Sequence, residues 1–412
     1  DASQPMPNAQ TLWEANSDLL SPSSPVKLRW ENGKGLIFTR KISINDDYLI
    51  TYDDSVASSL DRAITMYPYG LVRRQDTPSM SGLYILHEGP LGVFDETLDE
   101  QDYSDLKDAP IGGVKIKPSE PGGWIGITDK YWLAALLPSQ QDKFTYSFQS
   151  LPGKADRYQV DYIDHSGQVL SAGGAISTQG RLFAGAKKVV LLDHYKDELG
   201  IPNFDLAIDF GWFYFLTKPF FYAINWLFQL FGNFGVATLA FTVVVKLAFF
   251  PLANKSYRSM AKMRILTPKL QSLRERFGDD RMKLNQEMMA LYKAEKVNPA
   301  AGCLPVLLQI PVFFALYKVL FVTIEMRHAP FFGWVADLSA PDPTSIFNAF
   351  GLLPYSVDFL PPFLQLGLWP IFMGISMFLQ MRLNPAPPDP IQAKIFQWMP
   401  VFFTFLLATF PA

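Results

Sequence analysis

The alternation of apolar and polar positions is that of short strands from about residue 26 to residue 204. Short apolar runs occupy residues 34–44, 48–52 and 132–137, and clusters of Gly, Pro, Asn and Asp separate them. This spacing is typical of a β-sandwich, and no helical periodicity of useful length precedes about residue 180. Residues 1–25 are rich in Ser, Pro, Asn and Gln. We therefore predict a tether over 1–25 and an all-β domain over 26–204.

A long aromatic segment follows, and its pattern changes to that of a helix. Residues 205–232 contain many Phe, Tyr and Trp side chains, but Lys218, Pro219, Asn225 and Gln229 interrupt them. Aromatic rings prefer the headgroup level of a bilayer, which favours an amphipathic helix lying in the interface. A helix that spans the bilayer is the alternative interpretation.

Four apolar segments within 233–412 predict helices that cross a membrane. They cover residues 235–252, 304–324, 364–381 and 395–410, which is 18, 21, 18 and 16 residues. About 20 residues are needed to cross a typical hydrocarbon core. Three of the segments are shorter, and local thinning of the bilayer would accommodate them.

Charge is distributed unevenly, which predicts the orientation of these spans. Residues 1–210 carry 19 Lys and Arg against 29 Asp and Glu, whereas residues 251–300 carry 11 against 5. Basic connectors stay in the cytoplasm, so 251–300 should lie inside and 325–345 outside. The connector 382–394 then returns to the cytoplasm. This alternation places the β domain outside the cell membrane.

The basic connector also contains a helical pattern. Met263, Leu266, Leu270, Leu273 and Phe277 recur at heptad spacing, and a second stripe follows at Leu284, Met288 and Leu291. Gly278 can end the first helix and Asp279-Asp280 can cap the second. We predict an antiparallel helical hairpin over 255–297, kinked at Pro268.

This hairpin is either a solvated coiled coil or a docking arm for an anionic or hydrophobic partner. Five methionines between 260 and 289 favour docking, because flexible thioethers suit adaptable apolar contacts. The candidate docking residues are Met260, Met263, Arg264, Arg274, Arg276, Met288 and Met289.

Several kinds of catalytic or metal-binding motif are missing from the sequence. It has no G-x-x-x-x-G-K-[ST] phosphate loop, no H-E-x-x-H and no G-x-S-x-G. The four spans contain no Asp or Glu, and the chain has one Cys and four His. We therefore expect a protein that is not an enzyme, with no catalytic residues, no cofactor, no metal site and no direct recognition of nucleic acid.

Lys246 is a charged residue inside the apolar segment 235–252. A charge at mid-span costs about 2.5 kcal/mol or more, so such residues usually face a polar cavity or extend to the headgroups. Thr242 lies one turn earlier on the same helix face. We predict that both residues line a hydrated groove with polar positions of the other spans, and extension of Lys246 to the inner headgroups is the alternative. These positions are Gln309, Ser376, Gln380 and Thr404.

Four segments closely resemble the YidC/Oxa/Alb family of membrane protein insertases: residues 256–264, 273–280, 286–299 and 302–313. The match covers about 205–411. Residues 122–126 and 131–134 resemble, less tightly, the periplasmic domain of the Gram-negative members. Those members also have an N-terminal anchor helix and a last core helix, and we expect this chain to be a piece that lacks both.

The resemblance implies a multi-pass protein of the bacterial inner membrane. It implies a periplasmic β-supersandwich, a transmembrane helical bundle and a cytoplasmic hairpin that receives substrate. The groove charge of the family, usually Arg, corresponds to Lys246, and the groove threonine corresponds to Thr242. Lys keeps the charge but not the planar guanidinium, so we expect a point charge rather than a bidentate contact.

The partners implied by the resemblance are nascent membrane proteins, membrane lipids and the Sec translocon (SecYEG and SecDF). The ribosome and the signal recognition particle receptor are further candidates for the hairpin. Two other functions stay open at this point. One is a small-solute transporter in which Lys246 binds an anion. The other is an envelope protein that acts on carbohydrate through the β domain, with His87, His165 and His194 as acid-base groups.

Overall fold

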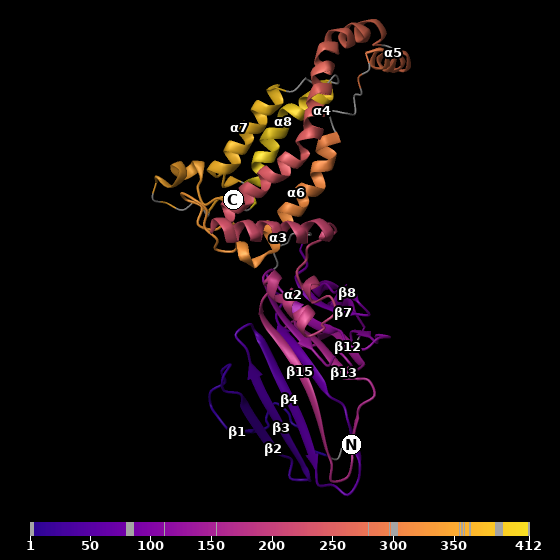
Figure 1. Ribbon diagram of the computed structural model, residues 1–412, viewed down its shortest axis with the longest axis vertical. Coiled ribbons are helices and arrows are strands. Elements are labelled where there is room, and N and C mark those ends of the chain that lie inside the picture. Colours follow the sequence, from indigo (N-terminus) through magenta and orange to yellow (C-terminus); the bar gives the residue numbers. More distant parts are fainter. Residues whose placement is uncertain are drawn as a thin grey trace. The chain divides into compact units, whose positions relative to one another are not determined.

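The chain forms two compact units, which Figure 1 shows in a computed structural model. The β unit comprises Asp1–Gly211 with Val322–Ile324, and the helical unit comprises Trp212–Phe321 with Glu325–Ala412. The structure describes residues 4–79, 86–110, 112–153, 155–278, 280–295, 297, 304–353, 355, 357, 359–361, 364–383 and 390–410.

The β unit is built from antiparallel strands, as the short alternating runs predict. The strands are β1 Glu14–Ala15, β2 Val26–Glu31, β3 Leu36–Ile44, β4 Leu49–Ser58, β5 Ile64–Met66, β6 Tyr69–Gln75, β7 Gly89–Phe94, β8 Thr97–Glu100, β9 Val114–Ile116, β10 Trp124–Thr128, β11 Trp132–Leu137, β12 Phe144–Leu151, β13 Arg157–Asp164, β14 Gln168–Leu170 and β15 Ala175–Ala186.

Two main sheets face each other in this unit. Within the described residues, one sheet has nine strands in the order β1-β2-β3-β4-β15-β11-β10-β7-β8, and the other has four in the order β6-β13-β12-β9. A further pair is formed by β14 and β5. β15 joins two parts of the large sheet, because it pairs with β4 from Ala175 to Phe183 and with β11 from Arg181 to Ala186.

The core of the sandwich lies between these sheets. The large sheet contributes buried side chains such as Ile125 and Leu136, and the small sheet contributes Phe148 and Val160. Along β13 the exposure alternates residue by residue from Arg157 to Tyr162, as expected for a strand with one face in the core. The predicted all-β sandwich is confirmed by this arrangement.

The N-terminal residues are more ordered than a tether. Glu14–Ala15 forms β1 and pairs with β2, and the ring of Trp13 lies 6.4 Å from that of Trp30. The apolar side chain of Trp13 gives this Ser- and Pro-rich segment something to bury, which its composition alone does not indicate. A short helix, α1 Tyr103–Asp108, also interrupts the strands, with Tyr103 and Leu106 buried.

A helical segment at the end of the β unit packs on the sheets. It contains α2 Val189–Glu198 and the 3-10 turn η1 Phe204–Ala207. Trp124 Nε1 donates a hydrogen bond of 3.0 Å to the carbonyl of Pro202, and Lys196 forms an ion pair of 2.9 Å with buried Asp205. The helix expected over 205–232 therefore begins later, at Tyr214, because residues 204–207 are held in the β unit.

The chain from Tyr214 onward is mainly helical. Its elements are α3 Tyr214–Phe231, α4 Phe234–Phe277, α5 Arg281–Ala294, α6 Leu304–Val322, η3 Ile324–Met326, η4 Ile346–Gly351, α7 Leu368–Leu383, α8 Pro390–Leu406 and η6 Leu407–Thr409. Within this unit α3 packs on α4, and α7 packs on α8.

The helix α4 combines two of the predicted elements. Among the described residues, its part Phe234–Met263 is the one helix long and apolar enough to cross a membrane, and 11% of its most apolar window is buried. The helix then continues through Pro268 to Phe277, where it forms the first arm of the hairpin. Shorter apolar helices occupy Leu307–Val322, Leu368–Leu383 and Ala393–Leu406.

Candidate functional site

Lys246 lies on the part of α4 that α3 leaves uncovered. The rings of Phe220 and Phe241 are 4.8 Å apart, and those of Phe228 and Phe234 stack at 3.7 Å, so α3 covers the first two turns of α4. Phe241 is the last buried residue of this stretch, and Lys246 is exposed beyond it. Lys246 therefore lies on an apolar part of α4 that α3 does not cover.

Thr242 occupies the same face of α4, one turn before Lys246. Its hydroxyl donates a 2.8 Å hydrogen bond to the carbonyl of Thr238, and its side chain is half-buried. This back-bond satisfies the hydroxyl hydrogen inside an apolar helix, while the oxygen can still accept a hydrogen bond.

The other predicted groove residues lie on α6, α7 and α8. Gln309 on α6 is exposed, and so are Ser376 and Gln380 on α7. Ser376 donates to the carbonyl of Met373 at 2.8 Å, and half-buried Thr404 on α8 donates to the carbonyl of Pro400 at 2.8 Å. Each hydroxyl is thus satisfied on its own helix.

Close packing joins α7 and α8 at one of these residues. A Cβ on Gly374 would come within 2.1 Å of Thr404 Oγ1, so the two helices meet at this glycine. Within the described part of the chain, no hydrogen bond or ion pair joins Lys246 or Thr242 to the polar residues of α6, α7 and α8. A groove shared by all six residues remains a prediction.

The hairpin has an apolar core of its own. Leu266 and Leu270 of α4 are buried against Tyr292 of α5 and Val297, and Met263, Met288 and Leu291 pack around them. The loop follows the sequence: α4 ends at Phe277, directly before Gly278, and the side chain of Asp280 caps α5 by accepting from Lys283 N at 3.0 Å. Lys269 and Glu295 form an ion pair of 2.7 Å across the two arms.

The outward face of the hairpin differs from the predicted docking set. Met263 and Met288 contribute to the hairpin core and are half-buried there, whereas Met289 is exposed. Met282 and Ile265 are the most exposed apolar side chains of the two arms, at 78% and 75%. Both are apolar residues that lie outside the two heptad stripes, and this position in the sequence indicates that they face outward.

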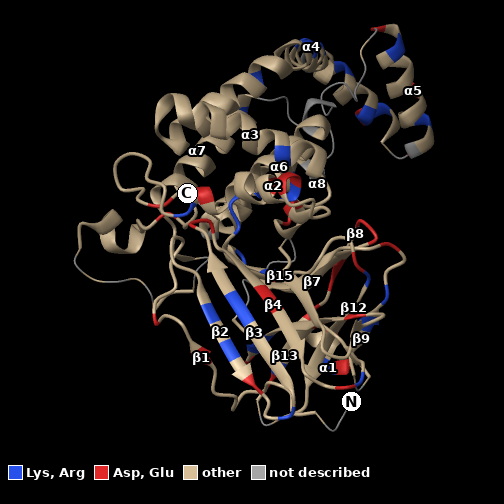
Figure 2. Cartoon of the chain, turned by 60° about the horizontal axis from the view of Figure 1, so that its bottom comes forward, with Lys and Arg blue, Asp and Glu red and all other residues tan. Residues whose placement is uncertain are grey.

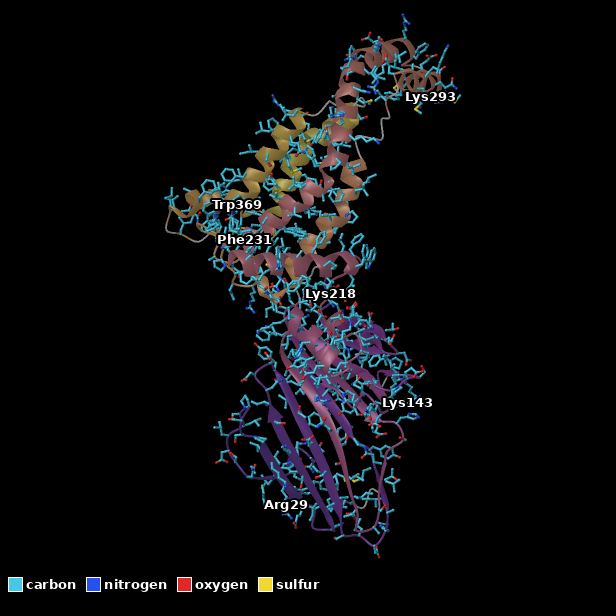
Figure 3. The ribbon with its side chains drawn as sticks, viewed as in Figure 1. Arg29, Lys143, Lys218, Phe231, Lys293 and Trp369 are labelled. Carbon is cyan, nitrogen blue, oxygen red and sulfur yellow. The ribbon has the colours of Figure 1, made fainter. Side chains whose placement is uncertain are left out.

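The charged docking residues are distributed along the same arms. Arg276 is exposed, Met260 and Arg274 are half-buried, and the side chain of Arg264 lies outside the described residues. Figure 2 shows Lys and Arg gathered on α5 and the distal part of α4, and few charges on α7. Lys293, labelled in Figure 3, lies in the last turn of α5.

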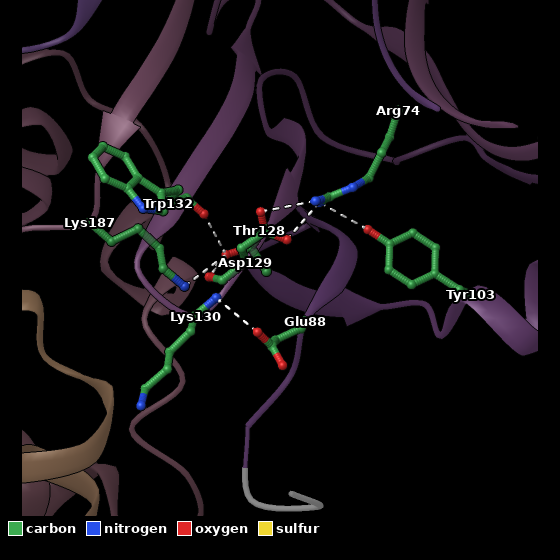
Figure 4. A network of polar contacts seen from close by, with 8 residues as sticks. All are labelled: Arg74, Glu88, Tyr103, Thr128, Asp129, Lys130, Trp132 and Lys187. Carbon is green, nitrogen blue, oxygen red and sulfur yellow. Dashed lines mark hydrogen bonds and ion pairs between the residues drawn. The ribbon is translucent and has the colours of Figure 1, made fainter. Parts of the chain in front are cut away.

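A buried lysine stands at the end of β15 in the β unit (Figure 4). Lys187 Nζ donates to Thr128 Oγ1 at 2.7 Å and to the carbonyl of Ala207 at 3.2 Å. Burial lowers the pKa of Lys187 to about 8, although the negative charges of Asp209 and Asp129 oppose the shift. The contacts hold η1 against β10, so this lysine has a structural explanation.

The three histidines considered for carbohydrate chemistry have separate surroundings. His87 Nε2 lies 3.1 Å from the carbonyl of Pro90, and His194 pairs with Glu198 at 2.8 Å on the surface of α2. His165 Nδ1 lies 3.5 Å from Thr145 Oγ1. A cavity of about 720 Å³ in the β unit is lined by residues that include Arg40, and none of the histidines lines it.

Comparisons with known proteins match both units. Residues 1–223 match the family described as "YidC periplasmic domain", and residues 226–412 match the "60Kd inner membrane protein" family. A "Membrane protein insertase YidC" of Granulibacter bethesdensis is 53% identical over 408 residues, which cover 98% of this chain and 71% of that protein. A protein of the same description from Methylobacterium nodulans is 52% identical over 415 residues, covering 99% of this chain and 68% of its own length.

Among solved structures, one titled "Active YidC insertase crystal structure with the first transmembrane domain resolved" is similar to the chain. It is 17% identical with a TM-score of 0.38, and the alignment covers 94% of this chain and 72% of that one.

Proposed function

The chain belongs to the YidC family of membrane protein insertases, and we propose from this premise how its residues move a substrate into the bilayer. As a family member it is an inner-membrane insertase with a periplasmic domain, and not an enzyme. The relatives are named as insertases, and they support neither a solute transporter nor a carbohydrate-acting protein.

Lys246 attracts the polar or acidic flank of the substrate in this proposal. The observation that carries it is an exposed ammonium group on α4, the helix whose apolar window is only 11% buried. Lys246 and Thr242 form the first wall of a hydrated groove that opens to the cytoplasm. Gln309, Ser376, Gln380 and Thr404 provide polar positions on the helices that complete it.

The hairpin binds the hydrophobic segment of the substrate first. Its exposed apolar side chains, Ile265, Met282 and Met289, offer contacts that adapt to different sequences. Its net positive charge supports a cytoplasmic position by the positive-inside rule. The ribosome, the signal recognition particle receptor and the Sec translocon (SecYEG and SecDF) are the proposed partners at this side and within the membrane.

Insertion is then driven by burial of apolar surface in lipid. Transfer of apolar area from water yields about 25 cal/mol per Å², so a substrate helix supplies the free energy itself. The helices α7 and α8 have apolar stretches shorter than the usual span, which thins the bilayer beside the groove. A thinner bilayer lowers the barrier for the polar flank, and no nucleotide is required of this protein.

Replacement of Lys246 in the full-length protein tests this mechanism. We expect Lys246→Ala and Lys246→Glu to slow insertion of single-span substrates with acidic tails by about tenfold or more, because a hydrogen bond to a charged group contributes about 1.5–3 kcal/mol. Lys246→Arg should retain most activity. Insertion is measured as protease-protected product in proteoliposomes.

Lys255→Ala is the matched control, because Lys255 is an exposed lysine further along α4. It should leave insertion unchanged. If Lys246→Ala inserts acidic-tailed and neutral-tailed substrates at wild-type rates, the groove charge has no part in the mechanism.

A further inference from the structure

We propose that the connector between α6 and α7 anchors the protein in the outer leaflet of the bilayer through a patch of exposed apolar side chains. The patch, called here the outer patch, lies on and around η4. Its residues are Phe332, Ile346, Phe347, Phe350, Leu352, Leu353, Tyr355 and Phe359. The side chain of Leu352 is 85% exposed, although it is purely apolar and its contact with water is unfavourable.

The sequence around the outer patch is almost free of charge. From Pro343 to Met381, a range that contains every residue of the outer patch except Phe332, Asp358 is the one charged residue. A connector that lies in water normally carries Lys, Glu, Asp and other polar side chains. Four of the eight residues of the outer patch are Phe and one is Tyr, and aromatic rings are enriched at the headgroup level of membranes. Lipid is therefore the partner whose chemistry fits.

The local backbone presents these side chains outward. Ser345 Oγ accepts from Phe347 N at 3.3 Å and begins the turn. Ala349 and Phe350 then take positive φ values of 50° and 58°, a conformation that costs free energy for residues other than glycine. Hydrogen bonds hold this turn in place: Phe350 N donates to the carbonyl of Ser345 at 2.7 Å, and Gly351 N donates to Asn348 Oδ1 at 2.9 Å. The apolar side chains on the turn are therefore kept in exposed positions, where lipid can cover them.

The base of the connector is held firmly to α7. Buried Asp342 accepts from Trp334 Nε1 at 3.1 Å with one carboxylate oxygen and from Trp369 N, at the start of α7, at 2.9 Å with the other. Thr344 adds a second bond to the same end of α7, because its Oγ1 accepts from Leu368 N at 2.9 Å. The outer patch is thus fixed to a membrane helix and is not a free loop.

The connector also contacts the chain where α3 ends and α4 begins, and these contacts fix its position along α4. Asn233 Nδ2 donates to the carbonyl of Pro330 at 3.3 Å, and the ring of Phe331 closes over Gly235. Both contacts lie at the N-terminal end of α4, where the aromatic helix α3 ends. Exposed apolar residues continue from the connector along α7 at Trp369, Phe372 and Ile375. The outer patch therefore extends the lipid-facing surface of α7.

Spin labels on single cysteines test the depth of the outer patch. The full-length protein, with Cys303→Ser and any other native cysteine replaced, carries Phe350→Cys or Leu352→Cys in vesicles of phosphatidylethanolamine and phosphatidylglycerol. We expect labels at both sites to collide with oxygen several-fold more than with a water-soluble nickel complex, at a depth of about 5–10 Å.

Two control sites make the result decisive. Val243→Cys, exposed on the apolar part of α4, should report the bilayer interior, and Lys143→Cys in the β unit should report water. If Val243 reports lipid but Phe350 and Leu352 report water, the outer patch does not bind lipid while the membrane position of α4 stands. If Val243 also reports water, the membrane premise itself fails. Labels shielded from both reagents would show a protein partner and overturn the proposal.

Discussion

Lys187 shows how burial of a single charge makes stability depend on pH. Its folded-state pKa is about 8, below the ordinary value of 10.5, because burial disfavours the ammonium form. Between these two values the unfolded state binds more protons than the folded state, so stability rises with pH across this window. Below pH 8 the lysine is charged in both states and its burial cost is fully present.

Lys187→Met should therefore abolish a rise in unfolding free energy on the order of 3 kcal/mol between about pH 8 and pH 10.5. The measurement is urea unfolding of the wild type and the variant at both ends of the window, followed by the near-ultraviolet signal of the β unit. Other groups titrate equally in both proteins, so the contribution of Lys187 is the difference between the two proteins in how the free energy of unfolding changes with pH. Parallel pH curves would show that Lys187 does not titrate in this window.

Gly374 is the second residue at which the structure makes a sharp prediction. Gly374→Ala places a Cβ within 2.1 Å of Thr404 Oγ1, so α7 and α8 must separate or Thr404 must rotate. We expect the free energy of unfolding to fall by about 1–3 kcal/mol, which thermal unfolding in detergent would measure. Thr404→Ala removes the clashing oxygen, and the double variant should recover most of the loss. Additive losses would contradict direct packing at this position.

At the scale of elements, the hairpin is the best predicted part of the chain. Its stripe and its Gly278-Asp280 turn were readable because helical periodicity and capping act within a few residues. The same stripe also indicated which methionines point inward, although the predicted docking set did not use it. Met263 and Met288 lie on the stripe and pack inside, so they cannot dock a partner without opening the hairpin.

Paired substitutions separate hairpin stability from docking. Leu270→Ala should destabilise the hairpin by about 2–5 kcal/mol, because Leu270 is buried between the arms, and should accelerate amide hydrogen exchange in α5. Ile265→Ala, five residues earlier and exposed, should leave that exchange unchanged. Equal exchange in both variants would mean that the arms do not pack as described.

The connector between α6 and α7 illustrates the opposite case. Asn348 and Gly351 at its ends are typical of a turn, but the left-handed conformation of Ala349 and Phe350 between them could not be predicted, because neither residue type favours it. The bonds from Asp342 to Trp334 and Trp369 link residues from separate elements. Such contacts depend on how the chain returns to itself, which local spacing does not encode.

At the scale of the whole molecule, the uneven charge predicts a definite orientation in the membrane. In a background with Cys303→Ser and any other native cysteine replaced, Lys293→Cys on α5 should be protected from an impermeant maleimide added to intact spheroplasts, and Lys143→Cys should react. The reason is that the positive-inside rule predicts a cytoplasmic position for the basic hairpin, on the side of the membrane opposite to the periplasmic β unit. Lysis should make both sites reactive. Labelling of Lys293→Cys in sealed spheroplasts would reverse the proposed topology.

The sequence by itself determined the kinds of element, the hairpin, the apolar segments and the lack of the catalytic motifs sought, because periodicity, turn residues and charge are local properties of the chain. Only the tertiary structure decided that β15 joins β4 to β11, that Trp13 packs on the sheet, and that η1 belongs to the β unit through Lys187. A pattern shows that a face is apolar, but it does not show which distant surface will cover it. That choice depends on shape and on the free energy of burial over the whole fold.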